Sequence, residues 1–213
     1  LFHRTMNDAK KAEWIFFHLH CKTVGYHNDM YPPSAQGQAR EVPVQDQVDE
    51  YEVIGPDGYG YPIYALKQNH KALYGSLISE QDMAKAYDDG NPYVNRDPRF
   101  YRDIIYHGSM FKGKWINTAT GADAINAANS TSTGYFTRKY FDGYYTKGMS
   151  GNWNFDAPLI RLATIYLVYA EAVTRSKGAT PEVYNLMNEL RARSFMAPIP
   201  PAAQTNKELL LDY

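Results

Sequence analysis

The segment between Pro158 and Arg175 constrains the fold most, because apolar side chains cover almost every side of it. One stripe recurs at helical spacing and consists of Leu159, Leu162, Ala163, Tyr166, Ala170 and Val173. Other apolar residues, among them Ile165 and Val168, lie elsewhere around the same helix. Glu171 stands four residues before Arg175, a spacing at which opposite charges attract. A helix that is apolar nearly all round must be buried on several sides.

A second helix is predicted from Pro181 to about Arg193. Thr180 is a suitable N-cap residue, and proline is favoured at the first helical position. The short connection Lys177-Gly178-Ala179 turns the two helices into a hairpin like a tetratricopeptide unit. Such units usually stack in arrays of at least about three. We therefore expect further helices beyond this pair.

A third helix is expected to begin near the end of the sequence. Thr205 and Glu208 have the spacing of a capping box, and apolar residues follow from Leu209. Because short isolated helices are marginal in water, we expect this helix to continue beyond Tyr213 in a longer protein.

The remainder of the chain is rich in loops. Short runs rich in β-branched and aromatic residues predict strands at Trp14–Cys21, Phe100–Tyr106 and Tyr135–Tyr140. The last two strands are expected to pair. Short helices are predicted at Val44–Tyr51 and Gln81–Asp88. Residues 117–134 are small and polar, and a connection of this length often belongs to a binding surface or a lid. The predicted fold class is mainly α, with long loops, a few short strands and tetratricopeptide-like helical hairpins.

Composition and motifs exclude several functions. Lysine and arginine total 22 against 23 acidic residues, and no basic stripe is present, so nucleic acid is not an expected partner. No apolar run reaches the roughly 18 residues of a membrane helix. The first twenty residues do not form a signal peptide. The single cysteine, Cys21, permits no internal disulfide. No nucleophile elbow, phosphate loop or dinucleotide fingerprint occurs, and no cofactor is predicted.

Aromatic residues are abundant, with 19 tyrosines, 9 phenylalanines and 3 tryptophans. Several of these rings lie in segments that read as loops. Large exposed rings need a cover, which is either another part of the protein or a ligand. A flat sugar face stacks on such a ring much as a nucleobase does. The candidate ligand-binding residues are Tyr26, Tyr31, Trp115, Tyr144, Tyr145 and Trp153.

Two pairs of polar residues suggest a metal site or a catalytic site. His18 and His20 would share one strand face, as in some zinc sites, but no third ligand stands at a suitable spacing, so no metal is predicted. Asp142 and Asp156 flank an aromatic loop and form the best carboxylate pair for glycoside hydrolysis. Their separation decides that mechanism and is a property of the folded chain, so a hydrolase stays open as an alternative, as does a purely structural helical scaffold.

Six motifs, taken in order, resemble the SusD/RagB family. They are the strand AEWIFF from Ala12, PVQDQVDEYEVIGPDG from Pro43, RDPRF with Asp97, Pro98 and Arg99, TRKY with Arg138 and Lys139, PLIRLATIYLVYAEA with Arg161, and NELRARSF with Asn188, Arg191 and Arg193. Asp97 is expected to cap its turn, and Arg99 to pair internally. Ser194 and Phe195 depart from the usual Ala-Gly of the family.

The resemblance implies a helical lipoprotein on the outer membrane of a Gram-negative bacterium, exposed at the cell surface. It would cover a TonB-dependent SusC-like barrel, capture glycans or in some members peptides, and catalyse nothing. The chain would be a fragment of the C-terminal half, with the lipid anchor outside it. Residues 1–157 would form a loop-rich ligand-binding part and residues 158–213 a truncated helical part, both within one SusD-like domain. The aromatic loops favour an oligosaccharide as the ligand over a peptide.

Overall fold

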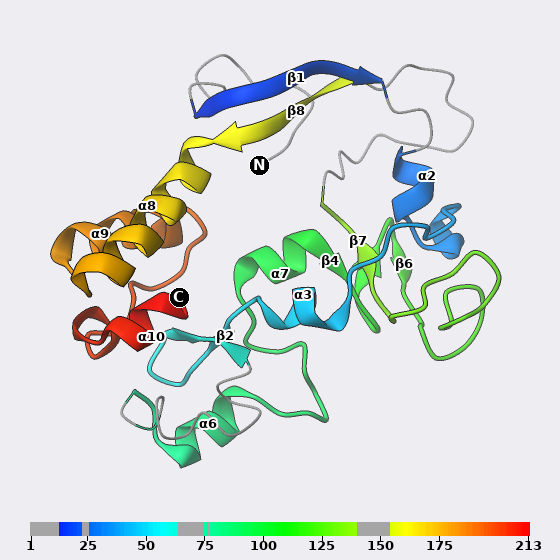
Figure 1. The fold of residues 1–213 in the computed structure, drawn as a ribbon. Helices are drawn as coiled ribbons and strands as arrows, with labels where there is room; N and C mark the ends of the chain where they lie inside the picture. Colours follow the sequence, from blue (N-terminus) through cyan, green and yellow to red (C-terminus); the bar gives the residue numbers. More distant parts are fainter. Residues whose placement is uncertain (1–12, 23–25, 64–74, 76, 140–153) are drawn as a thin grey trace. The chain divides into compact units, whose positions relative to one another are not determined.

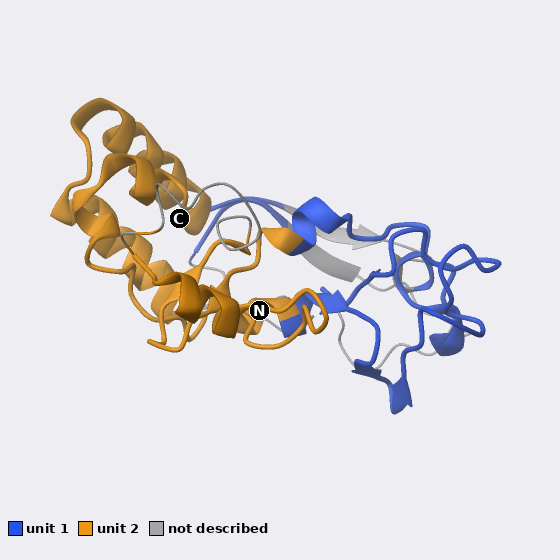
Figure 2. Cartoon of the chain, turned by 90° about the horizontal axis from the view of Figure 1, so that it is seen from below, with its two compact units in different colours: residues 1–48, 101–161 blue, residues 49–100, 162–213 orange. Residues whose placement is uncertain are grey.

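The computed structural model describes residues 13–22, 26–63, 75, 77–139 and 154–213, with the backbone alone at 18–22, 26–27 and 154–157 (Figure 1). The chain forms two compact units, each built from two separate stretches of sequence (Figure 2). Unit 1 contains residues 1–48 and 101–161, and unit 2 contains residues 49–100 and 162–213. The division of roles between residues 1–157 and 158–213 stays a prediction.

A long two-stranded ladder belongs to unit 1. Strand β1 (Trp14–Lys22) pairs antiparallel with β8 (Asn154–Arg161), and the two lie side by side in Figure 1. The strand predicted at Trp14–Cys21 is confirmed. The helix predicted to start near Pro158 starts instead at Leu162. Residues 158–161 pair with β1, and proline, which has no N–H to donate, is tolerated in an edge strand.

The other elements of unit 1 surround a small apolar core. They are helix α2 (Tyr26–Met30), the 3₁₀ turn η1 (Pro33–Ala35), most of α3 (Gln45–Asp49), and strands β4 (Ile104–Ile105), β5 (Met110–Phe111), β6 (Lys114–Trp115) and β7 (Phe136–Thr137). The core contains Met30, Tyr31, Ala39, Ile105, Phe111, Ile116 and Phe136. The expected pairing of the two middle strands is confirmed, since β4 pairs antiparallel with β7.

The strand predicted at Phe100–Tyr106 is wrong in its first half, where helix α7 (Pro98–Asp103) forms. The Asp97 carboxylate accepts a hydrogen bond from the Arg99 backbone N–H at 2.7 Å, and the Phe100 N–H donates to the Asp97 carbonyl at 2.8 Å. An acceptor before a proline starts a helix. Asp97 therefore caps the turn and pairs with the Arg99 guanidinium, as predicted.

Unit 2 is mainly helical. It contains strands β2 (Val53–Ile54) and β3 (Gly60–Tyr61) and the helices α6 (Glu80–Ala86), α8 (Leu162–Lys177), α9 (Pro181–Ala192), η2 (Ala203–Thr205) and α10 (Lys207–Leu211). Helices α8 and α9 form the predicted hairpin, and Tyr169 of α8 donates a hydrogen bond from its hydroxyl to Glu182 of α9 at 2.6 Å. The short helices predicted near residues 44–51 and 81–88 are confirmed as α3 and α6.

The core of unit 2 joins the helical hairpin to α6, α10 and the β2–β3 strands. It contains Tyr61, Ile78, Met83, Ala170, Val173, Val183, Met187, Ile199, Ala203, Leu209 and Leu210. Only one side of α8 takes part, because Leu162, Ile165, Leu167, Val168 and Tyr169 are exposed. The fold is therefore mainly helical with few short strands, as predicted.

The start of α10 differs from the prediction. Asn206, not Thr205, is its N-cap, and the Asn206 side-chain oxygen accepts from the backbone N–H groups of Glu208 and Leu209 at 3.0 and 3.3 Å. Thr205 ends the preceding 3₁₀ turn and donates its hydroxyl to the Ala202 carbonyl. Among the described residues, no helix is long and apolar enough to cross a membrane.

Candidate functional site

The predicted ligand-binding residues lie in different surroundings. Trp115 stands in β6 with 69% of its surface exposed. Tyr31 is 1% exposed, and its ring meets that of Phe111 edge-on at 5.0 Å. Because the fold seals Tyr31 into the core of unit 1, it offers no ring to a ligand, and its prediction as a contact residue is corrected. Tyr26 lies in α2 with only its backbone described. Tyr144, Tyr145 and Trp153 lie outside the described residues.

The exposure of Trp115 follows from the β5–β6 hairpin. Lys112 and Gly113 have φ values of 49° and 75°, as a tight two-residue hairpin turn requires. Phe111 is 1% exposed and faces the core, so its neighbour Met110 points to the opposite face of the hairpin. Met110 pairs across the ladder with Trp115 and is 49% exposed. The Met110–Trp115 face is thus an apolar surface, held by a rigid turn, that can stack against a flat ligand.

A polar hollow of about 470 Å³ lies elsewhere in unit 1, lined by Pro33, Gln36, Gly37, Gln38, Ala128 and Asn129. Its first wall is the segment around η1, and its second wall is the loop of residues 117–134. Ser34 joins the two segments, because its backbone N–H donates to Asp123 Oδ1 at 2.8 Å and Asp123 is buried. The sequence predicted the long loop as a binding or lid element, which stays a prediction, but did not place the η1 segment beside it.

The long loop has a defined conformation that its own side chains stabilise. The Asn117 side-chain oxygen accepts from the backbone N–H groups of Ala119 and Thr120 at 2.9 and 3.0 Å. The Thr131 hydroxyl oxygen accepts from the backbone N–H of Thr133 at 3.0 Å, and the Thr133 hydroxyl donates to the Pro43 carbonyl at 2.7 Å. A loop anchored in this way presents a preorganised surface, which lowers the entropic cost of binding.

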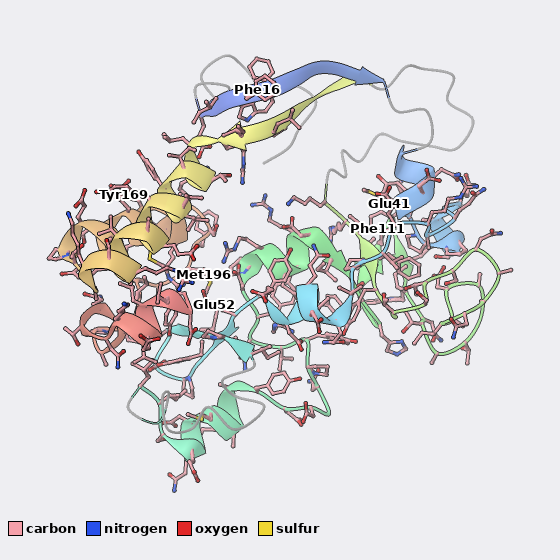
Figure 3. All side chains as sticks on the ribbon, viewed as in Figure 1. Phe16, Glu41, Glu52, Phe111, Tyr169 and Met196 are labelled. Carbon is pink, nitrogen blue, oxygen red and sulfur yellow. The ribbon has the colours of Figure 1, made fainter. Side chains whose placement is uncertain are left out.

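Arg191, one of the charged motif residues, serves the fold of unit 2. Arg191 lies in α9 and makes a two-pronged ion pair with Glu52, at 2.5 Å from Nη1 to Oε1 and 2.8 Å from Nη2 to Oε2. Arg191 Nε donates to the Ala197 carbonyl at 2.8 Å. Glu52 and Met196 stand close together beside Gly60, where an added Cβ would approach both side chains (Figure 3). The motif thus fastens β2 and β3 to the C-terminal end of α9.

Tyrosine hydroxyls complete this buried cluster. Burial, followed by the hydrogen bond to Asp57, raises the pKa of Tyr61 above its ordinary value. Burial also raises the pKa of Tyr213, whose hydroxyl donates to the Gly60 carbonyl at 3.0 Å. Both phenols are therefore neutral hydrogen-bond donors at physiological pH. They stabilise the fold of unit 2 and are not poised for proton transfer.

The residues of the hydrolase and metal-site alternatives lie partly outside the described side chains. Asp142 lies outside the described residues, and Asp156 is described by its backbone in β8, so no carboxylate separation follows for the hydrolase alternative. His18 and His20 lie in β1, also with the backbone alone. Over the described part of the chain, no group of three His, Cys, Asp or Glu side chains could hold a metal ion.

A tetratricopeptide-like helical hairpin, combined with a loop-rich unit that presents an exposed tryptophan and a polar hollow, defines a helical protein with a surface suited to ligand binding. The SusD family model matches residues 13–213, and the chain therefore belongs to the SusD family. No curated protein matches the chain.

Solved structures show the same fold. A SusD-like carbohydrate-binding protein from Bacteroides fragilis is 19% identical, with a TM-score of 0.68, and the match covers 100% of this chain and 39% of that one. A second SusD-like protein from Bacteroides fragilis is 24% identical, with a TM-score of 0.57, over 94% of this chain and 39% of its own. The chain therefore spans about two fifths of the length of these two proteins.

Proposed function

We propose that this protein captures glycans at the cell surface and passes them to a TonB-dependent SusC-like transporter. The full-length protein would be an outer-membrane lipoprotein that lies over the transporter barrel. Family membership and the similarity to a SusD-like carbohydrate-binding protein support this proposal. The observation that carries it is the exposed ring of Trp115 beside Met110 on one face of a rigid hairpin.

An exposed indole is suited to sugars because the C–H groups of a pyranose ring form a flat apolar face. Base stacking on an aromatic side chain contributes about 1–3 kcal/mol, and a similar value is expected here by analogy. A single contact of this strength is readily reversible, as transfer to a transporter requires. We propose further ligand contacts from Tyr26, Tyr144, Tyr145 and Trp153. Tyr31 instead packs against Phe111 of the hairpin in the core of unit 1.

Affinity electrophoresis of the full-length protein against a panel of polysaccharides tests the proposal. We expect at least one glycan to retard the wild-type protein and Trp115→Ala to reduce the retardation, with an affinity loss of about fivefold or more. Phe195→Ala is a matched control, because Phe195 is an 87% exposed ring in unit 2. Equal losses in the two variants would show a general effect of surface aromatics.

The same experiment separates the alternatives. Retardation by no glycan, together with binding to peptides, would assign the protein to the peptide-binding members of the family. Release of reducing ends from a bound glycan, abolished by Asp156→Asn, would establish the hydrolase and overturn the proposal. Undiminished binding by both Trp115→Ala and Trp153→Ala would place the ligand site elsewhere in the full-length protein or indicate a structural scaffold.

A further inference from the structure

Three primary amide side chains surround the hollow of unit 1. Gln36 and Gln38 come from the segment after η1, and Asn129 comes from the long loop. The other lining residues are Pro33, Gly37 and Ala128, so no charged side chain faces the hollow. Its volume, about 470 Å³, falls within the roughly 300–1,000 Å³ of small-molecule sites.

The hydrogen-bonding groups of these amides are unused within the described part of the chain. No described residue forms a hydrogen bond to the side chain of Gln36, Gln38 or Asn129, and Gln38 Oε1 is buried without a partner there. A buried carbonyl oxygen without a donor is costly. By contrast, the nearby Asn117 side chain accepts two backbone hydrogen bonds. Gln36 and Asn129 are exposed, so their amides are open to a molecule in the hollow, whereas protein atoms cover Gln38 Oε1.

The backbone conformation at two of these residues is well defined. Gln36 and Asn129 have φ values of 66° and 59°, in the left-handed region that few residues other than glycine favour. The Gln36 and Gly37 N–H groups donate to the Pro33 and Pro32 carbonyls at 2.8 and 3.0 Å. A Cβ added at Gly37 would stand 1.9 Å from the Tyr31 carbonyl oxygen, so this turn packs directly on the main chain. Strained backbone of this kind persists where the surroundings hold it firmly.

The hollow and the Trp115 face are separate surfaces. Lys114 reaches the η1 segment, where its Nζ donates to the Ser34 carbonyl at 2.7 Å. Adjacent residues of a strand point to opposite faces, so Trp115 points away from the side of the hairpin that contacts η1. A ligand in the hollow would thus bind by polar contacts, without stacking on Trp115.

We propose that this hollow is a second saccharide subsite, which holds an uncharged sugar residue through the amides of Gln36 and Asn129. The inference rests on the proposed glycan-binding function. A primary amide offers donors and an acceptor in one plane, which matches two neighbouring hydroxyl groups of a sugar. The uncharged lining provides no cation to compensate a carboxylate or sulfate, so anionic sugars are disfavoured.

Isothermal titration calorimetry of the full-length protein tests this subsite, with a neutral oligosaccharide taken from the glycan that retards the wild type. Gln36→Gly and Asn129→Gly each remove one amide, and glycine adopts the same positive φ without strain. We expect each variant to bind about three- to tenfold more weakly, as the loss of one hydrogen bond predicts. We also expect a uronic-acid oligosaccharide of equal length to bind the wild type at least tenfold more weakly than the neutral one.

Asn126→Gly is the matched control, because Asn126 lies in the same loop with a φ of 62° but does not line the hollow. Its affinity should equal that of the wild type, and the melting temperatures of all three variants should be no lower. The subsite would be overturned by any of three results. Gln36→Gly and Asn129→Gly could both bind with wild-type affinity, Asn126→Gly could lose as much affinity as they do, or the wild type could bind the anionic and neutral sugars equally well. If Trp115→Ala still loses binding in those cases, glycan capture stands. If the wild type binds no glycan, both proposals fall.

Discussion

At the scale of single residues, the ion pair of Glu52 and Arg191 is a sensitive point of unit 2. The two side chains are 9% and 7% exposed, so water screens their charges little. A buried charge that loses its partner is strongly destabilising, even where the intact pair contributes little net stability. The Arg191 guanidinium also lies over the Tyr213 ring, 5.2 Å from its centre, so the ion pair packs against an aromatic side chain as well.

We expect Glu52→Gln to lower the free energy of unfolding by about 3–5 kcal/mol, because Arg191 keeps its charge in a buried place. Urea denaturation of the full-length protein measures the change. Lys85→Gln is the matched control, since it breaks the exposed Asp82–Lys85 pair, which closes at 3.0 Å on the surface of α6. That pair should contribute at most about 0.5 kcal/mol. Similar losses in the two variants would contradict the structural role assigned to Glu52.

At the scale of elements, the turn between β2 and β3 depends on one side-chain contact. The Tyr61 hydroxyl donates to Asp57 Oδ2 at 2.6 Å, and Asp57 Oδ1 accepts from the Tyr59 backbone N–H at 3.1 Å. Tyr61 is fully buried. Burial and then Asp57 raise the pKa of Tyr61 above its ordinary value in the folded state. The unfolded chain therefore loses this proton first, near pH 10.

The raised pKa predicts alkaline destabilisation. The contribution of the Tyr61 hydroxyl to the free energy of unfolding is complete below about pH 10. It is lost as the pH rises above that value, because the unfolded state then binds fewer protons than the folded state. Tyr61→Phe has no such proton, so its unfolding free energy should fall less steeply between pH 9 and 11, although it should be about 1 kcal/mol lower at pH 7. Tyr213, whose pKa burial also raises, should keep a residual slope. Parallel curves for the wild type and the variant in urea denaturation would refute this account.

Local signals predicted the elements whose causes are local. Thr180 and Pro181 indicated the start of α9, and the structure places them there, with Pro181 in the first turn, although the Thr180 side chain makes no capping hydrogen bond. The apolar stripe suggested a helix from Pro158, but residues 158–161 pair with β1, more than a hundred positions earlier in the sequence. The aromatic run after Phe100 resembled a strand because the capping role of Asp97 was not used to place a helix. Distant pairing and side-chain caps therefore account for these misplaced boundaries.

At the scale of the whole molecule, the candidate surface was predicted only in part. Trp115 was predicted because its ring lies next to a long polar loop, and it is exposed. Tyr31 was also predicted from its place beside a loop, yet its ring packs against Phe111, eighty positions later in the sequence. The hollow was not predicted, since Gln36 and Asn129 come to line one hollow only through tertiary contacts such as the hydrogen bond from Ser34 to Asp123. Sequence finds candidate side chains, and only the fold decides which are brought together.

The outer face of α8 exposes several large apolar side chains. Leu167 and Val168 are 49% and 60% exposed, and Ile165 on the same helix is also exposed. Contiguous apolar surface of this kind usually marks an interface. The solved SusD-like proteins contain further chain, since this match covers 39% of each. We therefore expect other parts of the full-length protein to cover this face.

Val168→Asp in the full-length protein tests that expectation. If other helices cover α8, the carboxylate is buried without a partner, and the free energy of unfolding should fall by 2 kcal/mol or more, that is, by about the cost of burying an unpaired polar group. Val94→Asp provides the same chemical change in a loop, at a valine that is 40% exposed, and should change stability by at most about 0.5 kcal/mol. Urea denaturation compares the two variants. Equal, small changes would mean that α8 keeps its outer face in water in the full-length protein, and its apolar residues would then need a separate binding partner to explain them.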